Sequence, residues 1–178
     1  MPSSPFPSSW LALIAAALLA ACSPTFNWRD VPVGDAGLIA MLPCKADKAN
    51  RAVPLGAESV QVDMTGCEAG GATFAIAHAS ASGPAQAEAW LNAWRTATRA
   101  QLGGMQVTET SASVQRATAV PPPLRLDARP AQAGAPVQVL WFAQSQKDGT
   151  VALYQATVLG KPSAADASQT FFEGLRLP

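Results

Sequence analysis

The stretch Val137-Gln138-Val139-Leu140-Trp141-Phe142-Ala143 is rich in β-branched and aromatic residues. A second run of this kind, Val151-Ala152-Leu153-Tyr154-Gln155-Ala156-Thr157-Val158, follows after Lys147-Asp148-Gly149. An Asp-Gly step between two β-rich runs is a strong hairpin signal, because these residues accept the positive φ angles of a tight turn. The sequence therefore predicts two antiparallel strands here and a fold built on an antiparallel sheet.

Upstream of this hairpin, shorter runs predict further strands. The run 59–65 alternates between apolar and polar residues with the period of a strand. The run 72–79 follows as the next strand and places Phe74, Ile76 and His78 on one face. The expected strands are 37–43, 51–55, 59–65, 72–79, 105–116 and 124–128, and the expected turns include 44–50 and 66–71.

Two helices are expected. Pro84 suits the first position of a helix, and apolar residues then recur three and four apart as far as Leu102, before Gly103-Gly104. A shorter helix is expected to start at Pro162-Ser163, with Ser163 as its N-cap, and to end at Gly174. The buried stripe of the long helix would be Trp90, Leu91, Trp94, Ala97, Thr98 and Leu102, and that of the short one Ala167, Phe171 and Leu175.

Strands, a long helix, more strands and a short helix predict an α+β fold. We expect an antiparallel sheet meander with one long central helix and a short C-terminal helix, after an N-terminal signal helix. Residues 37–178 would form one domain, preceded by a tether at residues 22–36. The chain resembles the PsbP-like fold in the order of its elements and in three short stretches. These are Leu38-Ile39-Ala40-Met41-Leu42-Pro43, the helix around Trp90 and Trp94, and Phe171-Phe172-Glu173-Gly174-Leu175. The resemblance covers residues 36–178 and implies a fold without a function.

The N-terminal region has the features of an export signal. Its apolar run, residues 10–21, is shorter than the roughly 20 residues that span a bilayer, but it fits the core of a signal peptide. The stretch Leu19-Ala20-Ala21-Cys22 resembles the lipobox of bacterial lipoproteins. This resemblance implies removal of residues 1–21 and acylation of Cys22. It also implies attachment to the cell envelope, and Ser23 favours the inner leaflet of the outer membrane, facing the periplasm.

Two cysteines remain after Cys22. Cys44 and Cys67 are an even pair in an exported chain, which favours a disulfide, although two free buried thiols are the alternative. A metal site is disfavoured, since the chain has a single histidine and neither thiol has another cysteine nearby. We therefore expect no metal and no cofactor.

The composition argues against nucleic-acid binding. The chain has 12 Lys and Arg residues and 12 Asp and Glu residues, so its net charge is zero and it offers no basic field. The sequence that remains after the signal region has the usual length of a single domain.

Catalytic motifs are scarce. His78 could act as a general base, but no nucleophile or second ligand is marked near it in the sequence. We therefore expect a lipid-anchored, non-enzymatic domain that binds an envelope protein or assists an envelope complex. The alternatives are a small ligand-binding protein or enzyme that uses a cleft between sheet and helix near His78, and a purely structural lipoprotein.

Overall fold

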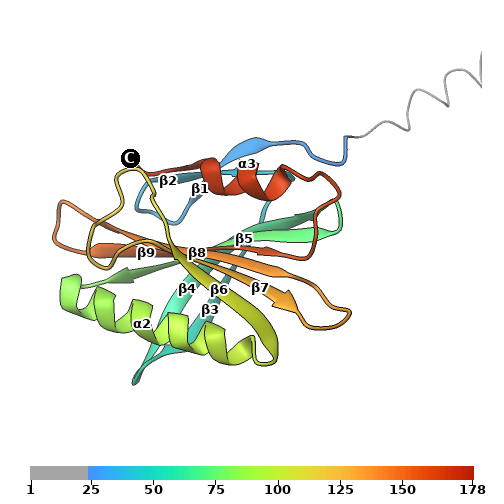
Figure 1. The fold of residues 1–178 in the computed structure, drawn as a ribbon. Helices are drawn as coiled ribbons and strands as arrows, with labels where there is room; N and C mark the ends of the chain where they lie inside the picture. Colours follow the sequence, from blue (N-terminus) through green and yellow to red (C-terminus); the bar gives the residue numbers. More distant parts are fainter. Residues whose placement is uncertain (1–23) are drawn as a thin grey trace, which may run out of the picture.

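The computed structural model describes residues 24–178 as an antiparallel, sheet-rich fold with one long and one short helix (Figure 1). This arrangement confirms the expected fold class in outline, whereas the expected signal helix lies outside the described residues. The strands are β1 (Arg29–Val33), β2 (Leu38–Leu42), β3 (Asp47–Leu55), β4 (Glu58–Ala69), β5 (Ala72–Ala81), β6 (Met105–Ser111), β7 (Leu124–Pro130), β8 (Val137–Ser145), β9 (Val151–Leu159) and β10 (Leu175–Arg176). The helices are α2 (Pro84–Gln101) and α3 (Ala167–Glu173).

Seven strands form the central sheet in the order β3-β4-β5-β9-β8-β7-β6. Two meanders meet in its middle, because β3-β4-β5 and β6-β7-β8-β9 are each built from sequential neighbours and β5 pairs with β9. Helix α2 links one meander to the other. The strands β1, β2 and β10 form a separate three-stranded sheet.

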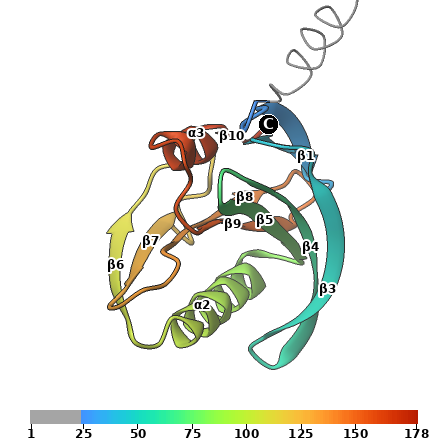
Figure 2. The ribbon, with the colours of Figure 1, turned by 90° about the vertical axis from the view of Figure 1, so that its right-hand side faces the viewer.

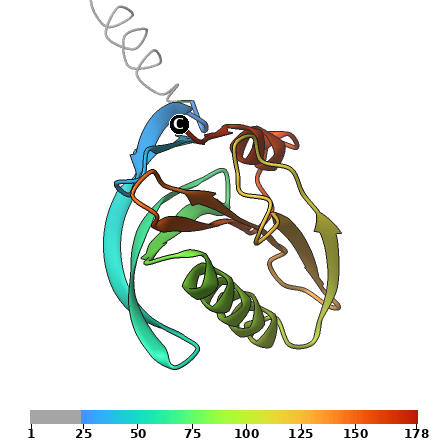
Figure 3. The ribbon, with the colours of Figure 1, turned by 90° about the vertical axis from the view of Figure 1, so that its left-hand side faces the viewer.

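The central sheet is covered on both faces. Helix α2 lies against one face, and the three-stranded sheet with α3 lies against the other (Figure 3). Each interface has its own hydrophobic core, and residues of β8 alternate between them: Leu140 and Phe142 face the three-stranded sheet, whereas Val139 and Trp141 face α2. A strand buried on both faces has a nearly continuous apolar sequence, which explains the composition of this hairpin.

The predicted hairpin is confirmed. Strand β8 pairs with β9 in antiparallel register from Val137 with Leu159 to Ser145 with Val151. In the connecting turn, Asp148 Oδ1 accepts hydrogen bonds from the backbone N–H and the hydroxyl of Thr150, at 3.0 and 2.7 Å. Gly149 has φ 89°, the left-handed conformation that glycine adopts without a steric cost.

The first meander is longer than the sequence predicts. Residues 47–50 were expected in a turn but extend β3, and residues 66–69 were expected in a turn but extend β4, so these two predictions are wrong. The reason is that β4 changes its buried face along its length. Val60 and Val62 face α2, whereas Cys67 faces the three-stranded sheet, so the single-period pattern ends while the strand continues.

The start of the short helix is also corrected. Helix α3 begins at Ala167 with Asp166 at the N-cap position, not at Pro162 with Ser163 as the cap. The backbone N–H of Ser163 instead donates to the carbonyl oxygen of Gly70 at 2.8 Å, which holds this segment against the β4–β5 turn. The end at Gly174 is confirmed, but Leu175 belongs to β10 and not to the helix.

The segment expected as a tether contributes to the fold from Phe26 onward. Phe26 and Trp28 stack with ring centroids 6.1 Å apart. Trp28 also makes an edge-to-face ring contact with Phe74, which belongs to the central sheet. The backbone N–H of Asn27 donates to Pro43 O at 2.7 Å, and the following residues form β1. The chain therefore enters the fold beside the three-stranded sheet, on the opposite side of the central sheet from α2 (Figure 1).

Cys44 and Cys67 form the predicted disulfide. Cys44 follows β2 of the three-stranded sheet, and Cys67 lies in β4 of the central sheet. The bond therefore joins the two sheets covalently at the interface between them.

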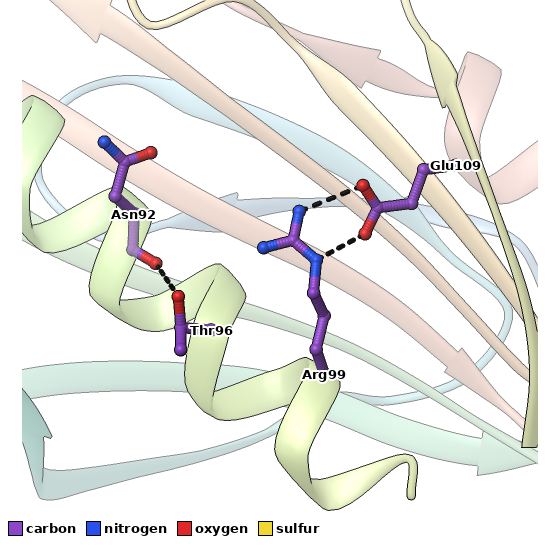
Figure 4. Close-up of polar contacts among 4 residues, drawn as sticks. All are labelled: Asn92, Thr96, Arg99 and Glu109. Atoms are coloured by element: carbon purple, nitrogen blue, oxygen red, sulfur yellow. Dashed lines mark hydrogen bonds and ion pairs between the residues drawn. The ribbon is translucent and has the colours of Figure 1, made fainter. Parts of the chain in front are cut away.

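An ion pair joins α2 to the outermost strand of the second meander. The guanidinium of Arg99 donates from Nε and from an Nη atom to the two carboxylate oxygens of Glu109, at 2.6 and 2.9 Å (Figure 4). One turn earlier, the Thr96 hydroxyl donates to the carbonyl oxygen of Asn92 at 2.9 Å. Glu109 lies in β6, which ends at Ser111 and not at residue 116 as expected; β6 is the mostly exposed edge strand of the central sheet, and this ion pair holds it to the helix.

Candidate functional site

The central sheet forks between β4 and β5. Their antiparallel register ends at the pair Asp63 and His78, although β4 extends back to Glu58 and β5 continues to Ala81. Beyond that pair β4 stays with β3, and β5 stays with β9. Figure 2 shows the β3–β4 hairpin curving away from β5 and toward α2. The fork leaves the facing backbone edges of the two strands without a strand partner.

An open surface hollow of about 340 Å³ occupies the fork. Three carboxylates line it: Asp35 from the turn between β1 and β2, Glu58 from the start of β4, and Asp63. His78 and Trp90 are among the other lining residues. The hollow is open to solvent, so it is not the deep cleft that the ligand-binding alternative predicts, but polar groups do converge near His78.

His78 lies at the point where the fork begins. Only 3% of its side chain is exposed, and its ring stacks on Tyr154 with centroids 5.1 Å apart. Tyr154 stacks in turn on Phe142 at 5.0 Å. Neither ring nitrogen of His78 nor the hydroxyl of Tyr154 has a hydrogen-bond partner within the described chain. Buried polar groups are normally paired, so these three atoms call for an explanation.

Asp63 and the β1–β2 turn lie next to the imidazole. Asp63 Oδ2 is 3.8 Å from His78 Nδ1, which is too long for a hydrogen bond, and Asp63 Oδ1 accepts from the Asn50 amide at 2.6 Å. Gly34 of the turn has φ 63°, and a Cβ there would collide with the imidazole. A glycine is therefore required for this turn to close over His78.

Glu58 is held by a network that reaches into α2. Its carboxylate accepts a hydrogen bond from Trp90 Nε1 at 3.1 Å and weaker ones from the Gln86 amide at 3.3 and 3.4 Å. Gln86 Oε1 accepts in turn from the backbone N–H and the hydroxyl of Ser82. The wall of the hollow on the α2 side is therefore held in place by hydrogen bonds within the chain.

Burial lowers the pKa of His78 below its usual value of 6.5, and the nearby charges of Asp35 and Asp63 oppose this shift only in part. The imidazole thus resists protonation in the folded state. Burial also raises the pKa of Tyr154, with a further contribution from Asp35, so its phenol stays neutral.

The lowered pKa predicts a loss of stability in mild acid. Above about pH 6.5, His78 is neutral in both states and the folded protein is unaffected. As the pH falls below this value, the unfolded chain takes up the proton more readily than the folded one, so the free energy of unfolding decreases. Urea denaturation between about pH 5 and 8 should show this decrease in the wild type and a flatter curve in His78→Gln. If the free energy of unfolding falls equally with pH in the wild type and in His78→Gln, the role of His78 is contradicted.

The predicted site residues are not gathered in this hollow. Cys22 lies outside the described residues, and Cys44 and Cys67 are bonded to each other and do not line the hollow. Trp90 and Trp94 are buried as expected, and Trp90 also lines the hollow.

Sequence reasoning missed the three carboxylates. Asp35 lies in the segment expected as a tether, Asp63 is a polar residue of the alternating run 59–65, and Glu58 belongs to no local motif. The fork and the β1–β2 turn together bring them to one place. Among the described residues, no group of three or more His, Cys, Asp or Glu side chains is arranged to hold a metal ion.

The sequence matches no model of a known protein family, and no match is found among curated proteins. The resemblances to the lipobox and to the PsbP-like fold therefore stay predictions. In residues 24–178, neither helix is long and apolar enough to cross a membrane.

Proposed function

We propose that this protein is a lipoprotein anchored through Cys22, and that its folded domain faces the periplasm and serves as a non-enzymatic binding or accessory module of the envelope. The observation that carries the proposal is the stretch Leu19-Ala20-Ala21-Cys22 after a short apolar run. A single acyl chain binds membranes only marginally, whereas several chains on one cysteine give firm attachment.

The disulfide supports this location. Disulfides persist in oxidising compartments, such as the bacterial periplasm, and are rare in the reducing cytosol. The Cys44–Cys67 bond would therefore be maintained where the proposed signal delivers the chain.

The place where the chain enters the fold supports a close attachment. Ordered packing begins at Phe26, so residues 22–25 alone would separate the lipid from the folded body. Four extended residues span at most about 14 Å. The lipid would thus keep the domain close to the bilayer. The three-stranded sheet would lie on the side nearest the membrane, and α2 would lie on the far side of the molecule (Figure 1).

Replacing Cys22 with Ala tests the anchor. We expect the variant to lose membrane association, either as soluble periplasmic protein or as unprocessed precursor, because no thiol remains to accept the lipid. Separation of inner and outer membranes on a density gradient, followed by immunoblotting, measures the change. The wild type is expected with the outer membrane.

The control is Thr25→Ala, which alters an exposed residue shortly after the lipobox and keeps both the thiol and Ser23. This variant should fractionate with the wild type. Recovery of Cys22→Ala in the outer membrane in wild-type amount would contradict the proposal.

Crosslinking of the wild type in intact cells tests the accessory role. A partner protein of the envelope should be recovered with the wild type and lost with Cys22→Ala, since the partner is reached at the membrane. Repeated recovery of the uncrosslinked protein alone would argue for the structural alternative.

A further inference from the structure

Two basic side chains face a common hollow at one end of the central sheet. Strands β8 and β9 pair at this end through Val137 and Leu159. The hollow has a volume of about 590 Å³, and the charged residues among the described residues that line it are Arg129, near the end of β7, and Lys161, shortly after β9. We call it the basic hollow. Within residues 24–178, neither cation lies at ion-pair distance from a carboxylate.

The basic hollow lies on the same side of the central sheet as α3. Along β7, Leu126 and Ala128 face α2, so the alternation of the strand places Arg129 on the opposite face. Helix α3 contributes Ser168 to the lining. Much of the remaining wall is apolar and comes from both ends of the β7–β8 loop and from the segment before α3: Pro130, Pro136, Pro162, Ala164 and Ala165.

The carboxylates near the basic hollow do not cancel its charge. Asp127 of β7 accepts hydrogen bonds from Arg125 Nε at 3.1 Å and from the Gln138 amide at 3.0 Å, so its charge is already compensated. Asp166 is exposed just before α3 and does not line the hollow, and Glu68 lines a separate hollow at the β4–β5 turn. The basic hollow therefore attracts anions.

The chain enters the fold beside this hollow. The backbone N–H of Ser163, in the segment that forms one wall, donates to the carbonyl oxygen of Gly70, and a Cβ on Gly70 would collide with the ring of Phe26. The chain entry, the β4–β5 turn and the segment before α3 lie at the same end of the molecule (Figure 1). Residues 22–25 reach at most about 14 Å from there. A lipid on Cys22 therefore brings a membrane surface within reach of the basic hollow.

The opposite end of the sheet is acidic. Asp35, Glu58 and Asp63 line the hollow at the fork, and Asp148 lies with Lys147 in the turn before β9. An anionic surface thus attracts the end of the domain nearest the anchor and repels the far end. Charge and tether favour the same orientation of the domain on a membrane.

We propose that the basic hollow receives the phosphate of an anionic phospholipid headgroup in the membrane to which Cys22 attaches the chain. Arg129 supplies a planar set of N–H donors and Lys161 a compact charge, and both suit a phosphodiester. The proline and alanine side chains of the wall contact the glycerol part of the headgroup. The inference rests on the proposed lipid anchor and extends it, because the contact fixes how the domain is oriented on the bilayer.

Hydrogen exchange of the mature lipoprotein, measured by mass spectrometry, tests this contact. The protein is placed in lipid nanodiscs of phosphatidylcholine alone, or of an equal mixture of phosphatidylcholine and phosphatidylglycerol. Peptides that cover residues 128–138 and 159–168 report on the basic hollow, and those that cover residues 145–151 report on the far turn. We expect exchange to slow at the hollow in the mixed discs only, since phosphatidylglycerol alone of the two lipids has a net negative charge. High ionic strength should reverse the slowing.

Two substitutions identify the side chains responsible. Arg129→Gln and Lys161→Gln should each shift the equilibrium from the docked toward the undocked domain by about fivefold, the contribution of one basic residue near an anionic membrane surface. The double variant should lose the slowing. Both side chains are exposed, so the fold should be kept, which unchanged exchange of β9 in phosphatidylcholine discs would verify. Lys147→Gln removes an exposed charge from the far turn and should leave the slowing unchanged.

The outcomes separate this inference from the anchor. Slowing that is confined to the mixed discs and lost in the double variant supports the inference. A wild type that enters neither kind of disc overturns the anchor and this inference with it, whereas entry into both kinds with equal exchange at the hollow overturns this inference alone. The inference is also overturned if Lys147→Gln reduces the slowing as much as the double variant does. Equal slowing by soluble glycerol phosphate in phosphatidylcholine discs would overturn it too, since the hollow would then take a free phosphate ester and not a lipid.

Discussion

Trp141→Ala should lower the free energy of unfolding by about 3–5 kcal/mol. Trp141 is fully buried on β8 in the core under α2, so its removal leaves a large cavity in the middle of the sheet. Its indole Nε1 donates to Gln155 Oε1 at 2.8 Å, and the Arg95 guanidinium lies over its ring at 6.0 Å. Both contacts are lost together with the packing.

Thermal unfolding is the measurement. For a chain of this size, the predicted loss corresponds to a fall in Tm of roughly 6–20 °C. Trp141→Phe should cost less, because an aromatic ring still fills most of the space. Val120→Ala is the control, since Val120 is 68% exposed and its truncation should change stability by less than about 0.5 kcal/mol. A Tm of Trp141→Ala within a degree of the wild type would contradict the assignment of this core.

Cys44→Ser is expected to cost about 3 kcal/mol. The disulfide closes a loop between residues 23 positions apart, and opening it restores conformational entropy to the unfolded chain. The variant also leaves the partner thiol of Cys67 unpaired at the interface between the two sheets. The fold should become less stable without changing its architecture.

Reductant provides the internal control. Adding it should lower the Tm of the wild type toward that of the variant and leave the Tm of Cys44→Ser unchanged. The double variant Cys44→Ser/Cys67→Ser should behave like the single one. A wild-type Tm that does not respond to reductant after full reduction would show that the bond contributes nothing.

The parts of the fold that follow from the sequence are those set by local chemistry. The Asp148-Gly149 turn, the proline that starts α2 and the glycine that ends α3 are each confirmed. In each case one residue type suits one backbone conformation, so neighbouring residues are sufficient to predict the element.

The parts that were missed depend on contacts between distant segments. Strand β4 changes its buried face because α2 covers its first half and the three-stranded sheet covers its second half, and the periodicity of a single strand does not reveal both layers. Residues 163–166 were expected to be helical, but Ser163 is instead held by Gly70 of a remote turn.

The candidate site was the least predictable part. His78 could be singled out because it is the only histidine in the chain. Its acidic neighbours come from a turn and from the edges of a fork that no local pattern indicates. Arg95 shows the same difficulty: it is buried and donates to Pro122 O at 2.7 Å, a contact with a distant loop that no local pattern indicates.

Intact mass spectrometry of the protein extracted from membranes tests the lipid anchor most directly. If the account is right, the chain begins at Cys22 and its mass exceeds that of the unmodified polypeptide by a diacylglyceryl group, with or without a further acyl chain on the new amino terminus. A chain that still carries residues 1–21, or that begins at Cys22 with a bare thiol, would contradict it.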